Sequence, residues 1–220
     1  VPVSALIDIW SLEQVVIVEM QNVMVPSMAT AAKAVRARDS DDYTGTLHDR
    51  GYDGSGIVIA VLDSGVDNEH RSLNDFDDKE DEPDLDASSY SDQKWLAGYD
   101  ATSQASNPDG TQDPDDGQSH GTHVTGIALG TGDISRVHTG VAPGAFLVDV
   151  KVLTDSGGTN SQNSQSGIQW MINNRDTEWP GTNDARGIQI GQMSFGSISS
   201  PFGGDDTGDN GTSTEARLVN

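Results

Sequence analysis

From Gly51 onward, the apolar positions of the chain follow two alternating patterns. Continuous β-branched runs are typical of strands buried on both faces, as in a parallel sheet covered by helices. Apolar residues that recur every three or four positions are typical of helices with one buried face. The patterns predict strands over 57–62, 146–153 and 187–196, a helix over 122–129 that begins near His120, and a helix over 164–173 with Ile168, Met171 and Ile172 facing inward. This alternation indicates an α/β domain with a mainly parallel sheet.

The first fifty residues have a different residue pattern from the rest and fall into two segments, so the chain divides into three parts. Residues 1–27 hold an apolar segment of helical character over 3–12 and a β-branched run over 15–18. Residues 28–50 are polar, rich first in alanine and then in aspartate, as is typical of a connector. We therefore expect an N-terminal unit over 1–27, a linker over 28–50 and the α/β domain over 51–220.

The balance of acidic and basic residues indicates which classes of binding partner to expect. The chain carries 12 basic and 35 acidic residues, which gives a formal net charge of −23 at pH 7. Because such a surface repels phosphate, we expect no nucleic-acid partner. Adaptation to salt, several calcium sites or an extracellular solubility strategy would each explain the excess of aspartate. The chain has no cysteine, and no apolar stretch approaches the roughly 20 residues that cross a bilayer.

A carboxylate stands at the end of the first predicted strand, in the segment Val61-Leu62-Asp63-Ser64-Gly65. Open α/β sheets place their functional groups at the carboxyl ends of the strands, so Asp63 is a candidate catalytic residue. A turn after any strand would also use Asp-Ser-Gly. An aspartic protease is a further alternative, but that all-β fold needs a second such loop, and the sequence contains none.

A histidine opens the helix that follows, in the segment Ser119-His120-Gly121-Thr122-His123. A rigid helix can hold His120 at the edge of a cleft, whereas a lone histidine is often only a surface or core residue. His120 and His123 could also suggest a zinc site. A zinc hydrolase would normally show His-Glu-x-x-His with its general base, and the chain lacks that pattern.

The two segments together resemble the subtilisin-like serine proteases, or subtilases, in which the aspartate precedes the histidine along the chain. The resemblance is carried by the aspartate motif Gly54–Asp67, the histidine motif Ser119–Gly126, the segment Gly140–Ala145 and the cleft strand Met193–Gly196. It covers roughly residues 51–200 and implies a subtilisin-like three-layer α/β fold, here truncated.

The resemblance also implies roles for individual residues. His120 would act as the general base and Asp63 would orient it, as two members of a catalytic triad. Ser194, Phe195 and Gly196 on one side, and Gly157 and Gly158 on the other, would bind the backbone of a polypeptide substrate. The resemblance further implies that no cofactor is required, although calcium can bind, and that the protein is secreted or held at the cell surface.

Residues 1–27 are similar to the end of a subtilase propeptide, a small α+β unit that occupies the enzyme's own cleft. The propeptide would then be a partner of the catalytic domain, and the maturation cut would fall between Val25 and Val35. The alternative is an ordinary N-terminal helix and strand of the same domain.

The nucleophilic serine is missing from the part of the chain that matches. Gly211-Thr212-Ser213 begins like the nucleophile motif, but Thr214-Glu215-Ala216-Arg217 does not continue it, and Ser213 is better explained as a helix cap. We therefore expect a fragment that has no protease activity by itself. The alternatives are a subtilase-like pseudoprotease that binds peptides and an unrelated acidic α/β binding protein.

Calcium is a candidate ligand of two acidic stretches, 75–92 and 107–116, the second with Asp109, Asp113, Asp115 and Asp116. Calcium prefers six to eight converging oxygens, and neither stretch has the full EF-hand spacing. The loop over 130–139, where many subtilases bind calcium, offers only Asp133 as a carboxylate. Solvated acidic loops are the alternative interpretation of both stretches.

Overall fold

The computed structural model describes residues 32–40, 42–73, 94–103, 109–132, 137–179 and 186–196. The predictions for residues 1–27, for the acidic stretch over 75–92 and for Ser213 lie outside the described residues. The described elements, in chain order, are the 3-10 helix η1 (His48–Arg50), strand β1 (Val58–Asp63), the 3-10 helix η2 (Arg71–Leu73), β2 (Trp95–Asp100), helix α3 (His120–Leu129), β3 (Phe146–Lys151), α4 (Ser161–Asn173) and β4 (Ile190–Met193).

The strands form one sheet in the order β2-β3-β1-β4, and every pairing is parallel. β1 is buried along its whole length, as its continuous apolar run predicts. Asp63, the last residue of β1, pairs in register with Lys151, the last residue of β3. Leu62 pairs with Met193, the last residue of β4. The carboxyl ends of three strands therefore meet at one edge of the sheet.

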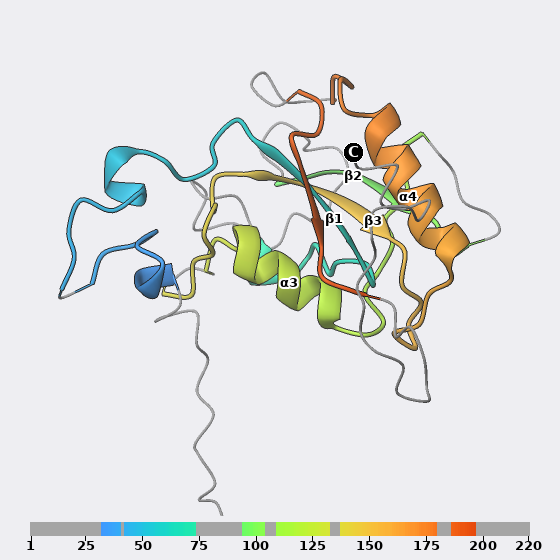
Figure 1. The fold of residues 1–220 in the computed structure, drawn as a ribbon, viewed down its shortest axis with the longest axis horizontal. Coiled ribbons are helices and arrows are strands. Elements are labelled where there is room, and N and C mark those ends of the chain that lie inside the picture. Colours follow the sequence, from blue (N-terminus) through green and yellow to red (C-terminus); the bar gives the residue numbers. More distant parts are fainter. Residues whose placement is uncertain are drawn as a thin grey trace, which may run out of the picture.

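Of the described helices, α3 covers one face of the sheet and α4 the other, which gives three layers (Figure 1). α3 packs on the face that carries Ile59, Val61 and Leu147, and it contributes the fully buried Leu129. α4 packs on the opposite face, where the ring of Trp170 stacks on Tyr99 with centroids 5.3 Å apart. This arrangement confirms the predicted subtilisin-like α/β fold.

The sequence pattern correctly predicted β1, α3, β3 and α4, with small differences at their ends. It also predicted β4, but over 187–196, whereas the strand covers only Ile190–Met193. Ile168 is buried, and Met171 and Ile172 pack against the same core, as expected. β2 was not predicted. Its run Trp95-Leu96-Ala97-Gly98-Tyr99 is short, and Gly98 disfavours a strand by propensity. The structure needs that glycine, because a Cβ there would lie 2.2 Å from the carbonyl oxygen of Gln112.

Residues 32–40 and 42–50 include two side chains that bond to the loop before β3. Arg38 Nη1 donates to the carbonyl oxygen of Val137 at 2.6 Å, and His48 Nε2 lies 2.8 Å from that of Val141. Within the described ranges, no helix has both the length and the apolar character that a membrane span requires.

Candidate active site

The site is built at the carboxyl edge of the sheet, around the last residue of β1. The side chain of Asp63 is completely buried, whereas that of His120 is 43% exposed. His120 is the first residue of α3, so the helix presents its imidazole directly beside the end of the strand. His120 Nδ1 lies 2.7 Å from Asp63 Oδ1. Since an ionised carboxylate only accepts hydrogen bonds, Nδ1 carries the proton in this pair.

Two further contacts fix this pair. The backbone N–H of Ser64 donates to Asp63 Oδ1 at 2.8 Å. Gly121 lets the helix approach the strand closely, because a Cβ at Gly121 would lie 2.1 Å from the carbonyl oxygen of Gly65. Asp63 Oδ2 is buried and accepts no hydrogen bond from the described residues.

The arrangement of Asp63 and His120 has a definite chemical capability. With Nδ1–H held by Asp63, the ring keeps one tautomer, and Nε2 is the nitrogen that can take up a proton. The buried carboxylate also stabilises the imidazolium that results. The pair can therefore serve as a general base with its orienting carboxylate. A zinc site is not formed in the described part of the chain, where no three metal-ligating side chains converge.

Asp116 and Ser64 belong to the site, although the sequence analysis gave them no role there. Ser64 Oγ donates to Asp116 Oδ1 at 2.8 Å and accepts from the backbone N–H of Gly121 at 2.9 Å. Asp116 lies four residues before His120, outside the N-cap position that Ser119 occupies, and its carboxylate still accepts from the N–H groups of Ser119 and Thr122. The rules of helix capping give no sequence signal at this spacing, and the surrounding acidic stretch suggested a solvated loop. The solvated interpretation does not hold at Asp116.

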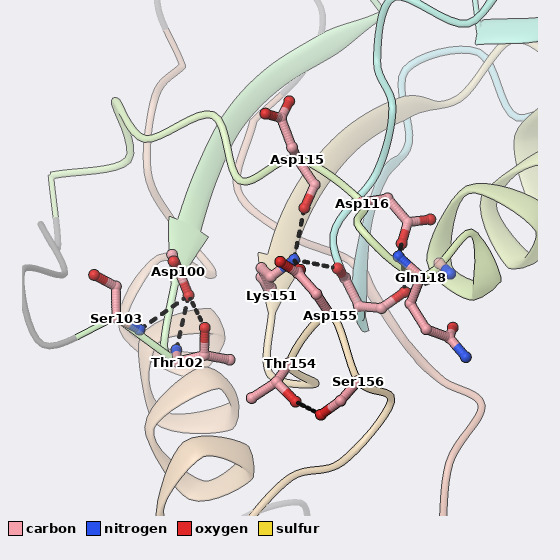
Figure 2. Close-up of polar contacts among 12 residues, drawn as sticks. Asp100, Thr102, Ser103, Asp115, Asp116, Gln118, Lys151, Thr154, Asp155 and Ser156 are labelled. Atoms are coloured by element: carbon pink, nitrogen blue, oxygen red, sulfur yellow. Dashed lines mark hydrogen bonds and ion pairs between the residues drawn. The ribbon is translucent and has the colours of Figure 1, made fainter.

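Lys151 is a second residue whose role the sequence analysis missed. Its side chain is 7% exposed, and Nζ donates to the carbonyl oxygens of Ser64 and Asp115 at 2.7 and 2.6 Å. It also donates to Asp155 Oδ1 at 2.6 Å. Figure 2 shows Lys151 between Asp115 and Asp155. The ammonium thus ties together the loop after β1, the loop before α3 and the loop after β3.

The two predicted substrate-binding segments lie on either side of β1. Gly157 and Gly158 follow β3 in an exposed turn, in which the N–H of Gly157 donates to Thr154 O and that of Thr154 to Gly158 O. The segment 194–196 follows β4 directly, with Ser194 and Gly196 exposed and Phe195 packed against the core. Because β3 and β4 both neighbour β1, both segments flank Asp63.

Several carboxylates of the acidic loop already have partners within the protein. Asp109 Oδ1 accepts from Thr111 N and Oγ1 at 3.0 and 2.6 Å. Desolvation, together with the neighbouring carboxylates of Glu69 and Asp115, raises the pKa of Asp113 to about 6. No group of three metal-ligating side chains is found where the chain is described. Calcium binding at the 107–116 stretch stays a prediction, and the stretch over 75–92 lies outside the described residues.

Asp149, in the middle of β3, is a fully buried carboxylate close to the site. Burial raises its pKa well above the ordinary value, against the opposing effect of a hydrogen bond from the N–H of Val66 at 3.0 Å. That hydrogen bond holds the loop that follows Asp63. The sequence pattern predicted a strand here without indicating a buried acid.

Comparisons with known proteins agree with this geometry. Residues 54–220 match the family model described as "Subtilase family". The chain is 32% identical over 163 residues to bacillopeptidase F and 34% identical over 128 residues to subtilisin E, both of Bacillus subtilis strain 168. These matches cover 69% and 58% of this chain but only 10% and 27% of the relatives' own lengths.

A solved structure shows the same fold. The CspB protease of Clostridium perfringens matches 88% of this chain and 37% of its own, with a TM-score of 0.55 and 18% sequence identity. At that identity the likeness concerns the fold alone. The family model covers most of the chain, including Asp63 and His120. The chain therefore belongs to the subtilase family.

Proposed function

We propose that this chain supplies the aspartate and the histidine of a subtilisin-type serine endopeptidase. The observation that carries the proposal is the 2.7 Å contact between His120 Nδ1 and Asp63 Oδ1, made by a half-exposed imidazole and a buried carboxylate. The exposed part of the imidazole leaves the ring accessible to a reacting group, as a general base requires. Membership of the subtilase family supports the same activity.

In the proposed reaction, Nε2 of His120 takes the proton from a serine hydroxyl as the oxygen attacks a peptide carbonyl. The same nitrogen then returns the proton to the departing amine. Asp63 stays ionised, keeps Nδ1 protonated and stabilises the imidazolium between the two transfers. No metal or cofactor takes part in these steps.

The substrates of this reaction are polypeptides in an extended conformation. We infer that residues 194–196 pair with the substrate backbone as an added strand, and that Gly157 and Gly158 border it on the other side. The exposure of these segments and their positions on either side of β1 support this assignment. Residues 1–27 would occupy the same cleft as a propeptide, in a protein that is secreted or held at the cell surface.

The nucleophile is proposed to lie outside these 220 residues. Ser213 is followed by Thr214-Glu215-Ala216-Arg217 rather than by the residues that continue the family's nucleophile motif. The chain by itself would then show no steady hydrolysis of casein. Activity of the isolated chain that Ser213→Ala abolishes would overturn this assignment.

The experiment that tests the function is casein hydrolysis by the protein expressed from its whole reading frame, compared with Asp63→Asn and His120→Ala variants. In subtilisin itself, loss of the histidine lowers kcat by about 10⁶-fold and loss of the aspartate by about 3 × 10⁴-fold, values that belong to that enzyme. We expect losses of similar order here. A whole protein that binds peptides without cleaving them would instead show a subtilase-like pseudoprotease.

A further inference from the structure

The carboxylate of Asp116 accepts most of the hydrogen bonds donated near the start of α3. Asp116 Oδ1 accepts from Ser64 Oγ at 2.8 Å, from the N–H of Gln118 at 3.0 Å and from that of Ser119 at 2.8 Å. Asp116 Oδ2 accepts from the N–H and the Oγ1 of Thr122 at 2.9 and 2.6 Å. Figure 2 shows Asp116 with Gln118 beside it. Both oxygens are thus engaged inside the protein.

These bonds set the backbone geometry that leads into His120. Ser119 has φ 73°, a left-handed conformation that is unfavourable by about 1–2 kcal/mol for a residue with a Cβ. Its N–H is one of the donors to Asp116, so the carboxylate stabilises this strained residue directly. Because Ser119 directly precedes His120, the backbone conformation of Ser119 determines where the backbone of His120, and therefore its imidazole, is placed.

The same carboxylate is linked to the catalytic aspartate by one intermediate residue. Ser64 Oγ bridges Asp116 Oδ1 and the N–H of Gly121, while the N–H of Ser64 donates to Asp63 Oδ1. Asp116 therefore contacts the residue after Asp63 and, through that residue, the one after His120. Burial acts to raise the pKa of Asp116, but the hydrogen bonds from Thr122, Ser64 and Gln118 outweigh it and keep the carboxyl ionised.

We propose that Asp116 is a positioning residue of the active site, which holds the strand end at Asp63 and the helix start at His120 in register through Ser64 and Ser119. The inference rests on the proposed function, because only a reacting His120 would require such precise placement. A cap that merely stabilised α3 would need the bonds to Thr122 but not the bridge to Ser64.

The test compares Asp116→Asn with Asp115→Asn in the protein expressed from its whole reading frame. Both variants remove one negative charge from adjacent positions, but the side chain of Asp115 is exposed. In Asp116→Asn, an NH₂ group replaces one of the two acceptor oxygens, and this group faces hydrogen-bond donors that it cannot accept from. We expect kcat for casein to fall about 100-fold, with KM little changed, as for a displacement of about 1 Å at a reacting group.

A second readout reports on the geometry without depending on turnover. The proton on Nδ1 of His120 should give a downfield NMR resonance while it is held by Asp63. We expect Asp116→Asn to shift this resonance upfield or to lose it to solvent exchange, and Asp115→Asn to retain it. If both variants keep the resonance and the same kcat, while Asp116→Asn only lowers the Tm, Asp116 is a structural cap and the proposal is wrong.

A third variant keeps the proposal testable if Asp116→Asn does not fold. Ser64→Ala breaks the bridge while leaving the other four hydrogen bonds of Asp116 in place, and it should alter the Nδ1 proton resonance in the same direction. An unchanged resonance in Ser64→Ala would overturn the proposal. If the wild-type protein cleaves no peptide, the proposed function fails separately, because the resonance still reports whether Asp116 positions His120.

Discussion

The tight approach between α3 and β1 leads to a sharp prediction at Gly121. Replacing this residue with alanine adds a Cβ at 2.1 Å from the carbonyl oxygen of Gly65 and 3.1 Å from the Cβ of Asp63. A carbon and an oxygen in contact need about 3.3 Å, so the helix must move away by roughly 1 Å. Overpacking of this kind costs about 1–3 kcal/mol of unfolding free energy. The same movement lengthens the contact between Asp63 and His120 and should lower kcat by about 100-fold.

Gly126 provides a matched control on the same helix. A Cβ there meets nothing within 4 Å outside the helix's own backbone, so alanine should add only its higher helix propensity. That gain is about 1 kcal/mol, and it is shared by both variants. Urea unfolding and casein hydrolysis are measured for Gly121→Ala and Gly126→Ala. The comparison separates the effect of the clash with the carbonyl oxygen of Gly65 from the effect of helix propensity. If the two variants are equally stable and equally active, the close packing of α3 on the loop after β1 does not govern the site.

Two further predictions concern charged groups around the site. The pKa of Asp113, raised to about 6, means that the folded state holds a proton more tightly than the unfolded state, so this carboxyl lowers stability as the pH rises from 4 to 6. Asp113→Asn should therefore raise the free energy of unfolding at pH 8, by on the order of 1 kcal/mol after solvent screening, but not at pH 3.5. Lys151→Met leaves the carbonyl oxygens of Ser64 and Asp115 without their donor, which should cost about 2–5 kcal/mol in urea unfolding. Asp155→Asn, which changes only an exposed partner of the same lysine, should cost less than about 1 kcal/mol.

The sequence contained enough to predict the architecture and the central pair. A continuous apolar run specified β1, because strands covered by helices on both faces need mostly apolar residues. β3 was predicted although Asp149 and Lys151 interrupt its apolar residues. The position of Asp63 at a strand end and of His120 at a helix start placed both at one sheet edge by topology alone. Their actual contact depends on Gly121, whose significance appears only when the carbonyl oxygen of Gly65 is located opposite it.

Other features of the site could not be predicted, because they depend on contacts between residues far apart in sequence. Asp116 stands in a stretch whose composition suggests a solvated loop, and its bond to Ser64 spans 52 positions. Lys151 lies in a run that predicts a buried strand, where a lysine would not be expected to be buried. Its partners, the backbone carbonyl oxygens of Ser64 and Asp115, carry no sequence signature.

On the face of the sheet under α3, the side chains change from apolar to polar toward the carboxyl ends of β1 and β3. This change explains why the proposed activity depends on the neighbouring loops. By the alternation of side chains, Ile59, Val61 and Asp63 share this face in β1, as do Leu147, Asp149 and Lys151 in β3. The apolar residues pack against α3, but the buried polar residues at the carboxyl ends need hydrogen-bond partners. Asp63 and Asp149 accept from the N–H groups of the loop after β1, and Lys151 donates to that loop and to the loop before α3. A change in either loop would therefore leave a buried polar group near His120 without its hydrogen-bond partner, so the fold couples loop integrity to the proposed activity.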